Sequence, residues 1–263
     1  MSRPQYLFKF KSIDTAIDLC RFEQILCDNV IFLPNKEMLN DPLESMTYRI
    51  TLCHAGGSYI TDHGHEDSYV TEAKNQYRIL SLSRSIHSPL MWAHYANNYT
   101  GACLIFSGDK TFSKAKKVKY TNQARYLDEG DFEEIDDVAL DSLFEKMKDW
   151  SYEKEWRYIE KEKPGLIHFN REELVGVVVG HNMPQEIRKT ISERCEEWSI
   201  PCFCTSVLLY DSKIIFFPEN MGKAEFEFWS MRDRIREEYS SEVFDLFAKL
   251  NKKQMKKWER MLR

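Results

Sequence analysis

The distribution of apolar and polar residues predicts short strands and helices in alternation. Apolar or alternating runs predict strands at residues 6–10, 30–33, 79–83, 102–106, 155–160, 174–180, 203–210 and 213–217. The run at 174–180 is almost entirely apolar, so we expect it to be buried on both faces. Helices are expected after Ser12 or Asp14 as the cap, at 66–77, at 184–198 and from residue 222 onward. This order predicts an α+β fold with flanking helices.

The stretch from Ser81 to Phe106 has the most distinctive pattern in the chain. It predicts a strand that ends in small hydroxyl residues, a short aromatic helix, a turn at Gly101 and a second apolar strand. Trp92 and Tyr95 recur at helical spacing on an apolar face, whereas His94 lies off that face. The aromatic side chains either belong to the core or form one wall of a cleft.

The C-terminal region combines an apolar helical stripe with a basic tail. Apolar or aromatic residues recur at spacings of three and four, interrupted only by Gln254, at Val243, Phe247, Leu250, Trp258 and Met261. From Ala248 to the end, seven bases stand against one acid, a net charge of +6. This tail is either the charged outer face of a packed helix or a contact with nucleic acid or an acidic partner.

Residues 125–149 are acidic, with ten carboxylates against three bases and a net charge of -7. We interpret this segment as a solvated insertion that carries one amphipathic helix from Val138 to Lys148. The predicted organisation is a core domain at 1–218, which includes the insertion, and a helical C-terminal extension at 219–263.

Composition limits the classes of protein that need to be considered. The chain has 263 residues, 43% apolar residues, 13% aromatic residues and a formal net charge of -5, so the overall charge gives no signal for nucleic acid. No apolar run approaches the roughly 18 residues of a membrane span, and the chain opens without an apolar leader. We therefore expect a cytoplasmic protein without membrane contact, whose seven cysteines are reduced.

Three histidines lie close together in a glycine-containing stretch, at His54, His63 and His65. Imidazoles at this spacing can bind zinc, but no fourth ligand follows at a suitable distance. We therefore predict no metal site. The sequence also has no glycine-rich phosphate loop, dinucleotide fingerprint or His-Glu-x-x-His helix, which removes several familiar enzyme classes as first choices.

Four motifs resemble those of the bacterial family known as domain of unknown function 2971. They are Tyr6–Phe10, Leu39–Glu44, Leu90–Ala96 with Gly101, and Trp150–Arg157. The resemblance covers about residues 5 to 190 and leaves the C-terminal helices outside. The family carries no settled activity, so this resemblance identifies a relationship rather than a function.

A weaker resemblance suggests a function. The order of Lys9 on the first strand, the pair Ser81 and Ser83 on a later strand, and a Glu-x-Glu motif at Glu153 and Glu155 is similar to ADP-ribosyltransferases with an Arg-Ser-Glu signature. That resemblance implies a split mixed β-sheet with NAD bound in the cleft between its halves. This chain has lysine where Arg or His is usual on the first strand, and leucine where Thr is usual between the two serines.

The resemblance implies the following roles. Cleavage between nicotinamide and ribose develops cationic charge on the sugar, which Glu155 would stabilise beside the 2'-hydroxyl. If the segment is a strand, Glu153 shares a face with Glu155 and would orient or deprotonate the acceptor. The implied cofactor-binding residues are Lys9, Ser81, Ser83, Trp92, His94, Tyr95 and Arg157, and the implied substrate loop contains Asn40, Asp41 and Glu44.

Three functions follow from these observations. The first is NAD-dependent ADP-ribosylation of a macromolecular acceptor by a toxin or antiphage effector. The second is metal-dependent phosphodiester cleavage by carboxylates at Asp41, Glu44, Glu153 and Glu155. The third is a non-catalytic ligand-binding or sensor module, in which a cleft with Trp92, His94 and Tyr95 recognises a small ligand and the C-terminal helices engage a partner. The alternative to a catalytic role for the charged residues of 153–157 is a set of cross-strand ion pairs on a solvated face.

Overall fold

The structure is a computed structural model. It describes residues 3–41, 43–49, 68–123, 125–127, 134–161, 165–208, 213–219 and 228–261. The three histidines considered above as zinc ligands, His54, His63 and His65, lie outside the described residues. The chain forms two compact units that interleave along the sequence: the first contains Met1–Asn29, Ser85–Gly108 and Asn170–Arg263, and the second contains Val30–Arg84 and Asp109–Phe169. The C-terminal helices therefore fall in the first unit, while the domain boundary expected at residue 218 stays a prediction.

The first unit is built on a mixed sheet whose strands run in the order β14-β13-β12-β5-β1. The strands β12 and β13 are parallel, and the other neighbouring pairs are antiparallel. Their bounds are Tyr6–Lys11 (β1), Ala102–Ser107 (β5), Leu174–Val179 (β12), Cys202–Leu208 (β13) and Lys213–Pro218 (β14). The apolar run predicted to be buried on both faces is β12, in which Val177, Val178 and Val179 are fully buried. The predicted α+β class is confirmed.

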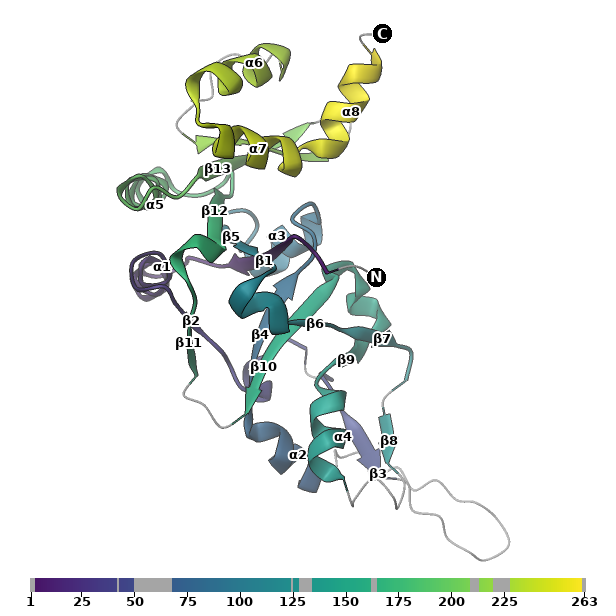
Figure 1. Cartoon of the computed structure of the whole chain (residues 1–263). Coiled ribbons are helices and arrows are strands. Elements are labelled where there is room, and N and C mark those ends of the chain that lie inside the picture. Colours follow the sequence, from purple (N-terminus) through teal and green to yellow (C-terminus); the bar gives the residue numbers. More distant parts are fainter. Residues whose placement is uncertain are drawn as a thin grey trace, which may run out of the picture. The chain divides into compact units, whose positions relative to one another are not determined.

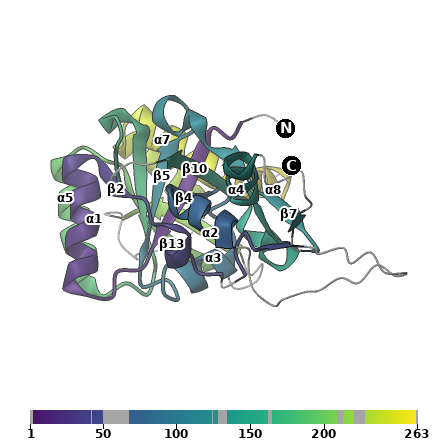
Figure 2. The same cartoon turned by 90° about the horizontal axis from the view of Figure 1, so that it is seen from below.

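Helices flank this sheet. They are α1 (Ala16–Asp28), α3 (Pro89–Tyr95), α5 (Gln185–Glu197), α6 (Phe228–Glu238), α7 (Ser241–Leu250), α8 (Lys252–Met261) and the short 3-10 turn η5 (Arg171–Glu173). Figure 2 shows α1 beside α5, and Arg194 on α5 pairs with Glu23 on α1 at 2.9 Å. The aromatic helix and the turn at Gly101 are found where the sequence predicts them.

One predicted helix cap in this unit is wrong, and the predicted C-terminal helical region consists of separate helices. The cap of α1 is Thr15, not Ser12 or Asp14, because Thr15 and Asp18 form a reciprocal capping box: the Thr15 hydroxyl accepts from the Asp18 N–H at 3.2 Å. The continuous C-terminal stripe is broken at Asn251, between α7 and α8. The Asn251 amide bonds to both the N–H and the carbonyl of Phe216 on β14, at 3.0 and 2.7 Å, so tertiary hydrogen bonds interrupt the helical pattern.

The second unit contains the strand order β4-β10-β6 and three small two-stranded pairings, β2 with β11, β3 with β8, and β7 with β9. The strand bounds are Val30–Phe32 (β2), Thr47–Arg49 (β3), Tyr77–Ser83 (β4), Lys116–Lys117 (β6), Lys119–Thr121 (β7), Arg125–Leu127 (β8), Glu145–Met147 (β9), Glu155–Lys161 (β10) and Leu166–His168 (β11). The helices are α2 (Ser68–Asn75), α4 (Ile135–Ser142) and the 3-10 turns η1 (Lys36–Met38), η2 (Lys110–Lys114) and η4 (Lys148–Glu153). Figure 1 shows α2 beside α4 and the long strand β10 along β4.

The acidic segment differs from its prediction. Its helix, α4, ends at Ser142 rather than at Lys148, and the chain then enters the short strand β9. Val138 and Ala139 pack into a core cluster that includes residues of α2, so this part of the segment is not a solvated insertion. Lys146, inside the predicted helix, is instead a buried strand residue.

The described residues include no helix that combines the length and the apolar character needed to cross a membrane.

Candidate functional site

The strands β4 and β10 bring the two predicted motifs together. They pair antiparallel, with Ser83 opposite Glu155 and Ser81 opposite Arg157. Because side chains alternate along a strand, Glu155 and Arg157 lie on one face of β10. Both side chains are buried, and so are those of Trp156 and Tyr158. The charged end of β10 is therefore an interior feature of the second unit and not a solvated edge.

Glu155 and Arg157 form a bidentate pair. The Arg157 Nε donates to Glu155 Oε1 at 2.8 Å, and Arg157 Nη2 donates to Glu155 Oε2 at 2.9 Å. The remaining guanidinium donors reach Glu44 Oε1 and the carbonyl of Leu143, each at 2.5 Å. Arg157 is fully buried. The ion pairs considered as an alternative for residues 153–157 are therefore present, but they are buried and do not lie on a solvated face.

Glu153 and Glu155 do not share a strand face, so this prediction is wrong. Glu153 closes the 3-10 turn η4, and Lys154 then adopts a left-handed conformation with φ 49° before β10 begins. A left-handed residue breaks the two-residue alternation on which the prediction depended. The position of Glu153 is fixed by its backbone, because its carbonyl accepts a hydrogen bond from the Ser83 hydroxyl at 2.6 Å.

The carboxylates converge on Lys146, a residue that the sequence did not single out. The Lys146 ammonium lies 2.7 Å from Glu153 Oε2, 3.3 Å from Glu44 Oε2 and 3.4 Å from Glu155 Oε2. It also lies 4.9 Å from the centre of the Trp150 ring. We call Glu44, Lys146, Glu153, Glu155 and Arg157 the ionic network. With three carboxylates and two cations, its formal charge is -1.

Burial and mutual attraction act in opposite directions on the protonation of the ionic network. Burial opposes the ionised form of Glu155, but the charges of Arg157 and Lys146 and the hydrogen bonds from Arg157 and Ser81 outweigh it and lower the pKa of Glu155 to about 2. For Lys146, burial lowers the pKa, and the surrounding carboxylates more than reverse this effect, so its pKa lies above the ordinary value. Glu155 and Lys146 are therefore both ionised near neutral pH.

The Glu155 carboxylate has its acceptor positions filled. Two hydrogen bonds come from Arg157, one from Lys146 and one from Ser81. A carboxylate offers about four lone-pair positions, so none remains for a ribose hydroxyl. The backbone of Glu155 is hydrogen-bonded as well, because the Tyr120 hydroxyl accepts from the Glu155 N–H at 2.8 Å. Burial, together with the charges of Glu155 and Glu153, raises the pKa of Tyr120 to about 12, so that hydroxyl stays neutral.

A pocket adjoins the ionic network at Lys146. Its volume is about 160 Å³, and it opens toward a wider hollow of about 500 Å³ that shares Thr121, Asn122, Gln123, Arg125 and Glu145 with it. The remaining lining residues are Leu43, Ser45, Met46, Ser142, Lys146 and Met147. All of these belong to the second unit. The pocket walls therefore combine apolar side chains with amide, hydroxyl and charged groups.

Ser45 is the unusual residue of this pocket wall. It is 3% exposed and has a left-handed backbone with φ 56°, a conformation that a residue with a Cβ seldom adopts. Its hydroxyl oxygen is buried without a hydrogen-bond partner among the described residues. Its carbonyl accepts a hydrogen bond from the buried Lys74 ammonium. No sequence signal marked Ser45, although it directly follows the predicted loop residues.

The predicted substrate loop divides into three different environments. Asn40 is exposed. Asp41 is buried, and its Oδ1 accepts from the Leu43 N–H at 2.9 Å while its Oδ2 has no partner among the described residues. Glu44 belongs to the ionic network. The turn predicted at this position is therefore present, and it places Glu44 within bonding distance of Lys146 and Arg157.

The other predicted cofactor residues lie in the first unit. Trp92 is fully buried: its Nε1 donates to the Ile86 carbonyl at 2.8 Å, and its ring stacks on Tyr99 at 5.4 Å. The core alternative is therefore correct for Trp92. His94 is exposed, and Tyr95 and Lys9 are half-buried. The predicted site residues that gather at one place are all in the second unit: Glu44, Ser81, Ser83, Glu153, Glu155 and Arg157.

The carboxylates of the predicted nuclease site surround a lysine ammonium instead of forming an open metal cage. Glu44, Glu153 and Glu155 all direct an oxygen to Lys146. Within the part of the chain that the structure describes, no group of three or more His, Cys, Asp or Glu residues is arranged to hold a metal ion. The geometry therefore offers no support for metal-dependent phosphodiester cleavage at these residues.

Residues 91–158 match the family described as "Protein of unknown function (DUF2971)". The chain carries a DUF2971 segment. The predicted relationship is confirmed over this range, which contains most of the third motif, the fourth motif and four members of the ionic network: Lys146, Glu153, Glu155 and Arg157. The motifs Tyr6–Phe10 and Leu39–Glu44 lie outside the matched range, so for them the relationship stays a prediction. Neither the comparison with curated proteins nor the comparison with solved structures found a match. The DUF2971 description assigns no activity, so a function must be argued from the site.

Proposed function

We propose that the second unit is a binding module for a small polar ligand, which it takes in the pocket beside the ionic network. The observation that carries this proposal is a pocket of about 160 Å³ whose lining includes Ser45, a buried residue with a hydroxyl that has no hydrogen-bond partner among the described residues. Leaving a buried hydroxyl unbonded costs roughly 1–3 kcal/mol, which a ligand acceptor would recover.

The pocket wall is held in place before any ligand arrives. Three carboxylates fix the Lys146 ammonium, and the Lys146 side chain lines the pocket. Glu44, which directly precedes Ser45, is bonded to both Lys146 and Arg157. The side chain of Lys74 bonds to the Ser45 carbonyl and, at 3.3 Å, to the Thr47 hydroxyl. A wall that is already ordered loses little entropy on binding, which favours affinity.

The volume limits the ligand to a small molecule or to the end of a larger one. An enclosed cavity of about 150 Å³ accommodates one benzene molecule. The wider hollow of about 500 Å³ next to the pocket leaves room for a further group that remains in contact with solvent. Ligands of this kind bury most of their surface and are oriented by a few polar groups.

Small-molecule enrichment tests the proposal. The purified protein is incubated with a filtered metabolite extract, re-isolated and denatured, and the released compounds are identified by mass spectrometry. Gln123→Trp places a large side chain at an exposed residue of the pocket mouth, and Lys148→Trp places the same side chain at an exposed residue outside the pocket. We expect at least one compound that wild type and Lys148→Trp enrich and Gln123→Trp does not. Equal enrichment by all three proteins refutes the proposal.

ADP-ribosyl transfer is a second candidate, favoured by one specific observation. The Glu155 carboxylate is ionised and accepts a hydrogen bond from Ser81 on the neighbouring strand, as the resemblance to the Arg-Ser-Glu transferases implies. An ionised carboxylate is the group needed to stabilise an oxocarbenium-like transition state. The substrate would be NAD, the acceptor a macromolecule, and the biological role that of a toxin or antiphage effector. This candidate requires one of the four bonds to Glu155 to be released on substrate binding.

Nicotinamide release separates the two candidates. Wild type, Glu155→Gln and the exposed control Asp149→Asn are incubated with NAD and cell lysate, and free nicotinamide is measured by chromatography. Transferase activity predicts release by wild type and Asp149→Asn that is lost in Glu155→Gln. The binding module predicts no release above a lysate-only control with any of the three proteins.

A further inference from the structure

The cations that line the pocket and the wider hollow differ in the partners they have among the described residues. Glu145 and Lys119 both line the wider hollow, and they pair with each other at 3.1 Å. Lys146 is bonded to three carboxylates of the ionic network, whose formal charge is -1. Arg125, which lines both the pocket and the wider hollow, has no acidic partner among the residues that the structure describes. Arg125 therefore differs from the other two cations of the pocket and the wider hollow, which are each held by a carboxylate.

The strand pairing places this cation close to the Ser45 wall. The strands β3 and β8 are parallel, and Arg125 is the partner of Thr47 in their register. Adjacent strands lie about 4.8 Å apart, and Ser45 precedes Thr47 by two residues, so the Arg125 and Ser45 backbones lie within about 12 Å of each other. A guanidinium side chain and a small ligand can together span this separation.

The other hydroxyl groups of the pocket are already used as donors. The Thr121 hydroxyl donates to the Gln123 carbonyl at 2.8 Å, and the Ser142 hydroxyl donates to the Ala139 carbonyl at 2.7 Å. The Ser45 hydroxyl has no such acceptor among the described residues. The pocket therefore offers one donor hydroxyl and one guanidinium, both of which require an acceptor.

We infer that the ligand of this pocket carries an oxyanion group, either a carboxylate or a phosphate, which pairs with Arg125 and accepts from Ser45. The inference rests on the proposed binding function and specifies the chemical class of its ligand. The planar guanidinium presents two parallel donors that match two oxygens of either group. The polar part of the ligand beyond the oxyanion lies against the amide side chains of Asn122 and Gln123 in the wider hollow.

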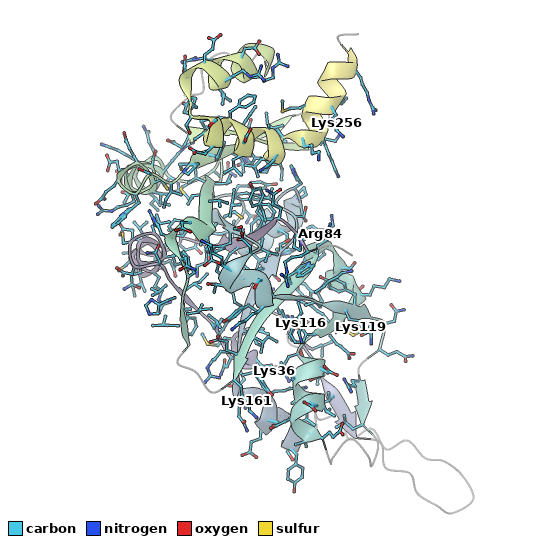
Figure 3. The ribbon with its side chains drawn as sticks, in the orientation of Figure 1. Lys36, Arg84, Lys116, Lys119, Lys161 and Lys256 are labelled. Carbon is cyan, nitrogen blue, oxygen red and sulfur yellow. The ribbon has the colours of Figure 1, made fainter. Side chains whose placement is uncertain are left out.

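Exposed lysines on a strand that precedes the pocket residues 121–123 in the chain add to the attraction of an anion. Lys116 and Lys117 are exposed on β6, whereas Lys119 on β7 is paired with Glu145 and adds no net charge; Figure 3 labels Lys116 and Lys119 in the second unit. Solvent-exposed charges of this kind accelerate the encounter with a charged ligand and are screened by salt. We therefore expect the rate at which the ligand associates to fall as the ionic strength rises, and the rate at which it dissociates to change less.

Calorimetric titration tests the inference with inorganic phosphate, pyrophosphate, succinate and the neutral sugar ribose. We expect at least one of the three anions to bind wild type, and Arg125→Gln to weaken that binding by about tenfold or more, because a hydrogen bond to a charged group is worth about 1.5–3 kcal/mol. Lys148→Gln removes the same charge at an exposed residue outside the pocket, and we expect it to change the affinity by less than about twofold. Preference for phosphates over succinate, or the reverse, identifies which oxyanion the pocket selects.

The outcomes distinguish failure of the inference from failure of the proposed function. If ribose or an enriched neutral metabolite binds in the pocket and no anion does, the ligand class is wrong and the binding function stands. If Arg125→Gln binds the anions as well as wild type does, the inference is overturned. If no probe binds and Gln123→Trp enriches the same compounds as wild type, both proposals fail. Thermal unfolding of Arg125→Gln, which we expect to match wild type, excludes misfolding, and Ser45→Ala provides a second variant with reduced anion affinity.

Discussion

Replacing Lys146 with methionine removes the cation at the centre of the ionic network while keeping a long apolar side chain. Three carboxylate oxygens lie between 2.7 and 3.4 Å from the Lys146 ammonium, and the Glu44, Glu153 and Glu155 side chains are each at most 4% exposed. In Lys146→Met only Arg157 remains to balance three buried negative charges. Breaking a buried ion pair by removing one partner costs about 3–5 kcal/mol, because the other partner keeps its desolvation cost.

The loss should depend on pH in a definite direction. With the ammonium removed, the crowded carboxylates repel one another, and the protonated form of at least one becomes favourable. Proton uptake relieves part of the destabilisation, so the difference between wild type and Lys146→Met is expected to shrink as the pH falls from 7 to 5. A loss of about 3–5 kcal/mol is a large share of the 5–15 kcal/mol typical of a folded protein.

Urea unfolding followed by circular dichroism measures this prediction, with wild type, Lys146→Met and Lys148→Met compared at pH 7 and pH 5. Lys148 is exposed and lies two residues away, so Lys148→Met is expected to change the unfolding free energy by less than about 0.5 kcal/mol. If Lys146→Met does not fold at pH 7, Ser81→Ala removes a single hydrogen bond to Glu155 and should cost about 1–2 kcal/mol. A Lys146→Met loss below about 1 kcal/mol, or one that is the same at both pH values, refutes the account of the network.

Three further predictions concern single contacts. The pKa of Glu155 falls from its ordinary value of 4.5 to about 2 on folding, so its ionised form stabilises the fold above pH 4.5 by about 3 kcal/mol. This stabilisation disappears as the pH falls toward 2. The unfolding free energy measured between pH 4.5 and pH 2 should show the loss, and an unfolding free energy that does not change over this range would contradict it. Thr15→Ala should lower the unfolding free energy by about 1 kcal/mol, because it removes the capping box with Asp18. Thr15→Ser keeps the hydroxyl and should change the unfolding free energy little. Equal losses in the two variants would exclude the hydroxyl as the cause. Asn251→Ala should lower the free energy of urea unfolding by about 2–4 kcal/mol, because it leaves the buried Phe216 N–H and carbonyl without their partners. Lys252→Ala, at an exposed residue, is the control, and an equal loss of unfolding free energy in the two variants would contradict this assignment.

The strand pattern of the sequence predicts part of the site well. The alternation of 155–160 predicted the strand on which Glu155 and Arg157 share a face, and the apolar spacing of Trp92 and Tyr95 predicted a helix with a packed side. These features succeed because side-chain period depends on local geometry. Neither Glu153 nor Lys146 could be placed in this way. Lys154 takes a left-handed conformation that glycine or asparagine would have signalled, and lysine next to acidic residues is usually exposed.

The pocket could not be predicted because its walls come from distant parts of the chain. Ser45 precedes β3, and Arg125 begins β8, which pairs with β3 in parallel. Thr121 and Glu145 lie on β7 and β9, another parallel pair of three-residue strands. Such short strands carry little periodicity, and parallel pairing between distant segments has no turn signal. Only the folded chain shows that the acidic segment contributes a pocket wall and a central lysine.

A crystal structure of the protein soaked in millimolar pyrophosphate tests the central claim most directly, with a second crystal soaked in NAD for comparison. The account predicts pyrophosphate density between Arg125 and Ser45, with Glu155 still bonded to Arg157 and Lys146. An empty pocket, together with NAD density at a Glu155 carboxylate released from these bonds, would contradict the account and favour the transferase.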